Sequence, residues 1–121
     1  MSRAARSVQV FALYLAGAGL WLVVDPESML DLVGMPVSDD VYVRLVGMMM
    51  GVLAVYYTAA ARAELTRFLT WTVPLRMAVL PTFVGFVIAG LAPPALVTFG
   101  IADLAGALWT RAALRRDPDG R

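Results

Sequence analysis

Three charged side chains, Arg44, Arg76 and Asp103, lie within stretches of sequence that are otherwise apolar. A charged side chain at the centre of a bilayer costs about 2.5–3.5 kcal/mol on insertion scales, so such residues usually have a partner or a function. The planar guanidinium of arginine can hold a carboxylate through two hydrogen bonds. The three residues are therefore candidates for an ion cluster inside the membrane.

Position along the predicted helices places Asp103 between the two arginines in depth. At a rise of 1.5 Å per residue, Asp103 lies roughly 13 Å below the break at Pro93 and Pro94. Arg44 is about one turn shallower, and Arg76 is about one to two turns deeper. Either guanidinium could then reach the carboxylate if the helices adjoin.

Three interpretations of this cluster stay open. The first is a structural Arg–Asp–Arg bridge that fixes helix register. The second uses the surplus positive charge of Arg44 and Arg76 to bind an anion, such as a lipid head group, a carboxylate or a polarised quinone oxygen, with Thr72 one turn away from Arg76 on the same face. In the third, Arg44 extends to the outer head groups and leaves Arg76 and Asp103 as a neutral pair.

Composition assigns the chain to the membrane and limits its chemistry. Of 121 residues, 60% are hydrophobic and 16% charged, against roughly 45–50% and 25% in a soluble domain. The sequence has no Cys and no His, which excludes disulfides, thiolate nucleophiles, imidazole bases, and metal or haem sites built on either residue. We expect no metal and no cofactor. With a single carboxylate in the core, we also expect no enzymatic activity.

Four apolar stretches predict an all-α fold: an integral membrane four-helix bundle in one transmembrane domain, residues 1–121. The predicted spans are residues 7–24, 41–61, 66–92 and 95–114, each near the roughly 20 residues needed to cross a bilayer. Asp25 and Pro26 predict the start of a short interfacial helix between the first two spans, and Gly34 its end. Pro74 and Pro81 predict kinks in the third span.

Two further expectations concern the ends of the spans. Ser38 or Asp39 is the expected cap of the second span. The first stretch could instead be a signal peptide, because Arg3 and Arg6 precede an apolar run. No clear small-residue cleavage site follows it, which favours a retained helix.

Charges outside the spans predict the orientation. The arginines precede the first span, separate the second from the third, and end the fourth: Arg3, Arg6, Arg62, Arg67, Arg111, Arg115 and Arg116. The loops on the opposite side carry acidic residues and no arginine. By the positive-inside rule, both termini face the cytoplasm. The exclusive use of arginine with abundant Ala, Val, Leu and Gly indicates a GC-rich bacterial genome, and hence the inner membrane.

Glycines beside the charged residues predict close helix packing. Gly47 and Gly51 form a GxxxG pattern on the face that carries Arg44, and Gly100 and Gly106 lie three residues on either side of Asp103. Small residues let membrane helices approach closely. The pattern predicts a tightly packed bundle with its charged face inward.

A resemblance to a known family rests on a glycine-rich first span, on Pro26-x-x-x-Leu30, and on Arg44 followed by Gly47 and Gly51. In this layout the chain resembles small bacterial four-helix membrane proteins of the DoxX-like type. The segment FGIADLAGALWT, residues 99–110, is similar to a motif of their relatives. The resemblance implies a four-helix bundle, sometimes an accessory subunit of a membrane oxidoreductase, and implies no particular catalytic residue.

The sequence therefore predicts a multi-pass inner-membrane protein, an accessory bundle that holds a hydrophobic or anionic ligand and associates with the bilayer, a second copy or a membrane partner. Nucleic-acid binding is not supported, because the loop arginines set topology and touch anionic lipids. One alternative is a small transporter or anion-conducting protein, dimeric in form. Another is the membrane subunit of a quinone-linked oxidoreductase. Its candidate proton carriers are Asp103, Tyr14, Tyr42, Tyr56 and Tyr57.

Overall fold

The computed structural model describes residues 1–36 and 40–116, and every regular element in this part of the chain is an α-helix. The helices are α1 (Arg3–Val24), α2 (Pro26–Val33), α3 (Asp40–Arg62), α4 (Thr66–Ile88) and α5 (Leu96–Arg116). The all-α prediction is thereby confirmed. The predicted caps Ser38 and Asp39 lie outside the described residues.

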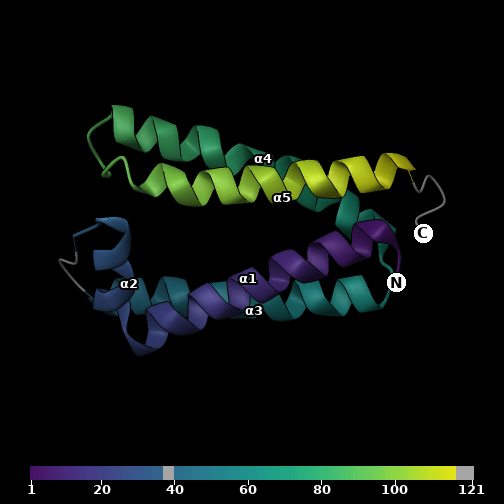
Figure 1. Cartoon of the computed structure of the whole chain (residues 1–121), viewed down its shortest axis with the longest axis horizontal. Helices are drawn as coiled ribbons and strands as arrows, with labels where there is room; N and C mark the ends of the chain where they lie inside the picture. The colour runs from purple at the N-terminus through teal and green to yellow at the C-terminus, as the bar shows by residue number, and fades with distance from the viewer. Residues whose placement is uncertain (37–39, 117–121) are drawn as a thin grey trace.

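The long helices form two antiparallel pairs (Figure 1). We call α1 and α3, joined through α2, the first hairpin, and α4 and α5 the second hairpin. The hairpins meet at the end of the molecule that holds the start of α1, the α3–α4 turn and the end of α5 (Figure 1). There Ala4, Ala5 and Val8 of α1 share a fully buried cluster with Leu69 of α4 and Ala113 of α5.

Three of the helices, α1, α3 and α4, are long and apolar enough to cross a membrane. Large apolar side chains cover their outer faces, and Leu13, Met49, Leu75 and Ile88 are all more than half exposed. Such a surface is unfavourable in water and suits contact with lipid chains. The chain is thus a helical membrane protein with three candidate spans. Helix α5 has 21 residues but contains Asp103 and Arg111, and it is not one of the three.

Helix ends follow local sequence signals. The side chain of Asp25 accepts a hydrogen bond from the backbone N–H of Ser28 at 3.3 Å, and Gly34 closes α2 in the left-handed region at φ 78°. The short helix between the first two long ones is thus present, while its place at an interface stays a prediction. The helix ends earlier than the predicted third span, residues 66–92, because α4 stops at Ile88 and Gly90 follows in the left-handed region at φ 77°.

Helix α4 continues through both of its prolines. Pro74 has no N–H to donate to the carbonyl of Thr70, and Pro81 none for that of Met77. The flanking helical hydrogen bonds keep a single helix from Thr66 to Ile88.

Glycines bring the backbones of α1 and α3 into contact. A Cβ atom built on Gly19 would lie 2.6 Å from the carbonyl oxygen of Gly47, and one on Gly47 would lie 2.6 Å from that of Gly19. The obstacle on each side is backbone, which a side-chain rotation cannot move away. By contrast, a Cβ on Gly51 would meet nothing within 4 Å. Of the two glycines in the GxxxG pattern, Gly47 is therefore the one that lets α1 and α3 approach closely. Gly51 contributes only its backbone N to this contact.

Candidate functional site

Arg76 of α4 is the most deeply buried charged residue in the described part of the chain, with 3% of its surface exposed. Its Nε donates to the carbonyl of Thr72 at 3.4 Å, and its Nη2 donates to Thr72 Oγ1 at 3.2 Å and Thr110 Oγ1 at 2.7 Å. The guanidinium carbon lies 4.8 Å from the centroid of the Phe11 ring, in cation–π geometry. Arg76 therefore contacts α1 and α5 as well as its own helix.

Thr110 of α5 connects Arg76 to the first hairpin. Its hydroxyl lies 2.7 Å from Ser7 Oγ of α1 and 3.1 Å from the carbonyl of Gly106. Ser7 Oγ also lies 2.7 Å from the carbonyl of Ala4, as a donor to it. Each hydroxyl has one proton, so one hydroxyl donates to the other, and the second donates to the backbone carbonyl on its own helix. Both side chains are fully buried, and this chain joins α1, α4 and α5 where the hairpins meet.

Gly106 makes room for this arrangement. A Cβ atom at this position would lie 2.9 Å from Phe11 Cδ1 and 3.1 Å from Arg76 Nη1. Gly100, one and a half turns earlier, faces α4, where a Cβ would lie 3.0 Å from Leu80 Cα. Gly100 thus lies where α5 packs on α4, and Gly106 lies next to the Arg76 guanidinium and the Phe11 ring of α1.

Asp103 of α5 is half-buried, and it lies close enough to Arg76, Tyr14 and Tyr57 for electrostatic interaction. Among the described residues, ion pairs within 4.0 Å join Arg44 to Asp40 and the Met1 amino group to Glu64, and none includes Asp103. The predicted Arg–Asp–Arg bridge is therefore absent from this part of the chain. Arg76 takes hydroxyl and carbonyl oxygens in place of the carboxylate.

Arg44 does not form an ion pair with Asp103, so the interpretation that joined the two in an Arg–Asp–Arg bridge is contradicted. Its guanidinium donates to the carbonyl of Val23, at the end of α1, and lies 3.5 Å from the carboxylate of Asp40 one turn earlier. Along α1, Val23 is twelve residues from Phe11, the ring that contacts Arg76, or roughly 18 Å. The free carbonyls at the end of α1 satisfy Arg44 locally. Of the three interpretations, only the one that takes Arg44 away from Asp103 agrees with this contact, and a reach to the outer head groups stays a prediction.

One nitrogen of the buried guanidinium is unsatisfied. Arg76 Nη1 is buried and has no hydrogen-bond partner within the described ranges. Thr72 and Thr110 accept from Nε and Nη2, so both N–H donors of Nη1 remain unused. An unpaired buried donor on a charged group costs free energy, which an additional oxygen atom would recover.

Several residues at this site were not singled out from the sequence. Thr110 lies seven residues after Asp103, two helical turns along the same face, and this spacing could have identified it. Phe11 had no such signal, since it is one apolar residue among many. Its ring lies 5.5 Å from that of Tyr14 and 6.1 Å from that of Tyr57, which brings two of the candidate proton carriers toward Arg76. The other two tyrosines, Tyr42 and Tyr56, are exposed on α3.

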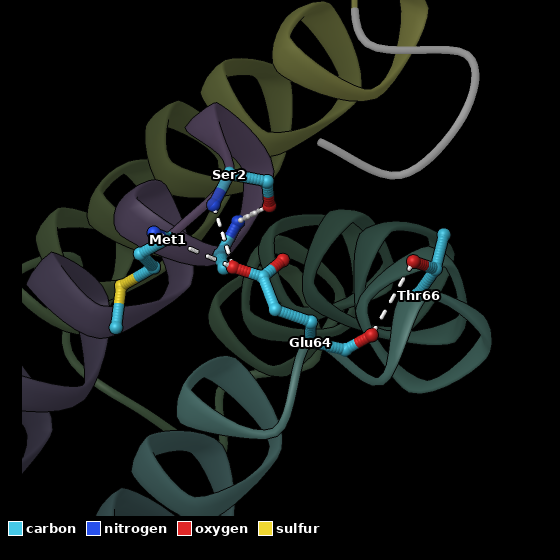
Figure 2. A network of polar contacts seen from close by, with 5 residues as sticks. Met1, Ser2, Glu64 and Thr66 are labelled. Carbon is cyan, nitrogen blue, oxygen red and sulfur yellow. Dashed lines mark hydrogen bonds and ion pairs between the residues drawn. The ribbon is translucent and has the colours of Figure 1, made fainter.

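A second polar network holds the start of α1 against the α3–α4 turn (Figure 2). The carboxylate of Glu64 accepts a hydrogen bond from the backbone N–H of Ser2 at 2.6 Å and lies 3.8 Å from the Met1 amino group. Ser2 in turn caps α1, because its hydroxyl accepts from the N–H of Ala5 at 3.0 Å. Glu64 adopts φ 54°, unusual for a residue with a side chain. This contact fixes the turn between the two hairpins.

The Glu64 contact should make stability depend on pH in the acid range. The Ser2 N–H lowers the pKa of Glu64 from its ordinary value of 4.5. A lowered pKa adds stability above the ordinary value, and this stability is lost as the pH falls through the lowered pKa. We expect Glu64→Gln to reduce the melting temperature in detergent at neutral pH, and the difference from wild type to shrink as the pH falls through the lowered pKa of Glu64. Asp31→Asn, an exposed change on α2, serves as control; a Glu64→Gln difference that persists in acid would contradict the assignment.

Comparison of the chain with protein-family models, with curated proteins and with solved structures finds no match.

Proposed function

We propose that the protein is a four-span accessory bundle of the bacterial inner membrane, without enzymatic activity of its own. In this proposal it holds a hydrophobic molecule with an anionic or carbonyl oxygen at Arg76, where the two hairpins meet. Lipid head groups, carboxylates and quinones all offer such an oxygen. The layout of the DoxX-like type, which the sequence resembles, agrees with an accessory role for the bundle.

The observation that carries the proposal is the unsatisfied Nη1 of a guanidinium that is 3% exposed and has no carboxylate of a described residue within 4.0 Å. Burying arginine in a membrane is costly, and proteins normally pair it. Here hydroxyls and an aromatic ring take the place of a counter-ion. An oxygen of a bound molecule would supply the missing acceptor and part of the missing negative charge.

The fourth span and the orientation are part of the same proposal. Helix α5 packs along α4 with similar length, and its last turn ends beside the start of α1 (Figure 1). That end of the molecule also holds Arg62, Arg67, Arg115 and Arg116. With α5 across the bilayer, all of these arginines would face the cytoplasm, as the positive-inside rule requires.

Native mass spectrometry of the protein extracted in mild detergent tests the ligand. We expect wild type to carry a bound hydrophobic species and Arg76→Gln to lose it. The matched control is Arg44→Gln, which removes the same charge near the start of α3, beside the end of α1, and should keep the species. Circular dichroism checks that each variant is folded. If wild type carries nothing, or if Arg76→Gln retains the species while folded, the proposed ligand site is wrong.

A further inference from the structure

An open groove of about 490 Å³ runs between α4 and α5 at the end of the molecule where the hairpins meet. We call it the α4–α5 groove. Trp71, Val73 and Pro74 line it from α4, and Arg111, Leu114 and Arg115 line it from the last turns of α5. Its residues lie within about three turns of the ends of these helices, which is the depth of a membrane interface if both helices span.

The groove combines positive charge with an apolar floor. Arg111 and Arg115 are four residues apart, so their side chains lie one above the other on the same face of α5. Both are exposed, and neither forms a hydrogen bond or an ion pair to another described residue. Among residues 1–36 and 40–116, no acidic residue lines the groove. Two adjacent guanidinium groups can hold a phosphate through several charge-assisted hydrogen bonds.

Two features of α4 add to the chemistry of the groove. Pro74 has no N–H to donate to the carbonyl of Thr70, another lining residue, so that oxygen lacks its usual helical donor. Trp71 is 64% exposed at the rim, and tryptophan is enriched at the level of lipid head groups. The apolar side chains of Val73 and Leu114 continue the groove along the helices.

We propose that the α4–α5 groove binds one anionic phospholipid. Its phosphate lies between Arg111 and Arg115, and its acyl chain follows Val73 and Leu114. Basic pockets between membrane helices on the cytoplasmic side are the usual site for such head groups. A soluble anion would use the two arginines but would gain nothing from the apolar floor, so the lipid is the occupant that matches both parts of the groove.

The test adds phosphatidylglycerol or phosphatidylcholine to the delipidated full-length protein in detergent and counts bound lipid by native mass spectrometry. We expect phosphatidylglycerol to bind with one-to-one stoichiometry and phosphatidylcholine to bind far more weakly. The double variant Arg111→Gln/Arg115→Gln should bind phosphatidylglycerol about tenfold or more weakly. Both side chains are exposed, so the fold should persist, which circular dichroism verifies.

The matched control is Arg62→Gln/Arg67→Gln, which removes the same charge at the same end of the molecule but outside the groove. It should bind phosphatidylglycerol as wild type does. Equal loss in both double variants would mean that only surface charge attracts the lipid, and the proposal would be wrong. It would also be wrong if phosphatidylcholine bound equally well, or if inorganic phosphate displaced the lipid. Arg76→Gln should leave this lipid in place, so the result is separate from the ligand at Arg76.

Discussion

Gly47→Ala should destabilise the protein by about 1–3 kcal/mol, the usual cost of forcing extra volume into a packed contact. The added methyl group would lie 2.6 Å from the carbonyl oxygen of Gly19, and backbone cannot rotate aside. Helices α1 and α3 must then separate along the whole first hairpin. Thermal unfolding in detergent measures the effect.

Gly51→Ala is the matched control for this prediction. It makes the same change one turn later on the same helix, where a Cβ meets nothing within 4 Å. We expect no loss of stability there, and a gain of up to about 1 kcal/mol from the better helix propensity of alanine. If Gly47→Ala and Gly51→Ala had equal effects, the close crossing of α1 and α3 would be disproved.

The second large effect is expected for Thr110→Val, which keeps the shape of the side chain but removes the hydroxyl between Arg76 and Ser7. The change leaves another donor of a buried guanidinium without its best acceptor, at a cost of about 1–3 kcal/mol. Thr82→Val is the control, because the hydroxyl of Thr82 is exposed and bonds only to Ala78 on its own helix. Melting temperature in detergent compares the two.

A double-mutant cycle with Arg76→Met separates the role of the charge from that of packing. Arg76→Met alone should change stability little. It loses membrane hydrogen bonds of about 0.6 kcal/mol each, but it also removes the cost of burying a charge, and the two changes oppose each other. In the Arg76→Met background, Thr110→Val should cost much less than in wild type. Equal costs in both backgrounds would show that the Arg76–Thr110 hydrogen bond contributes nothing.

Hydropathy and capping signals predicted the helices well, because those signals are local. The Asp25–Pro26 start and the Gly34 end of α2 depend only on neighbouring residues. The error at the end of α4 has a local cause too: apolar residues continue to Ala92, but Gly90 turns the chain first. Apolarity alone cannot show where an apolar segment stops being helical.

The arrangement of the charged residues could not be predicted in the same way. The position of a residue along its helix predicts how deep the side chain lies in the membrane, but it does not predict which helices pack against each other. Arg44 had a suitable height for Asp103, yet α3 packs mainly on α1, and the carbonyl of Val23 is the acceptor that α1 offers there. The sequence also could not predict that the Thr110 hydroxyl accepts from Arg76, because this contact depends on how the helices of the two hairpins are rotated against each other.

The hydrogen bond between Ser7 and Thr110 joins residues 103 positions apart. At a synthesis rate of about 5–20 residues per second, Ser7 leaves the ribosome roughly 5–20 s before Thr110 does. Arg76 is made between them and has no acceptor from α5 during the later part of that interval. The hydrogen bond from Arg76 to Thr110 can therefore form only after most of α5 has been synthesised, and until then the guanidinium has only the acceptors of Thr72 on its own helix. An insertase or chaperone that shields arginine in this interval would act on α4 while α5 is still being made.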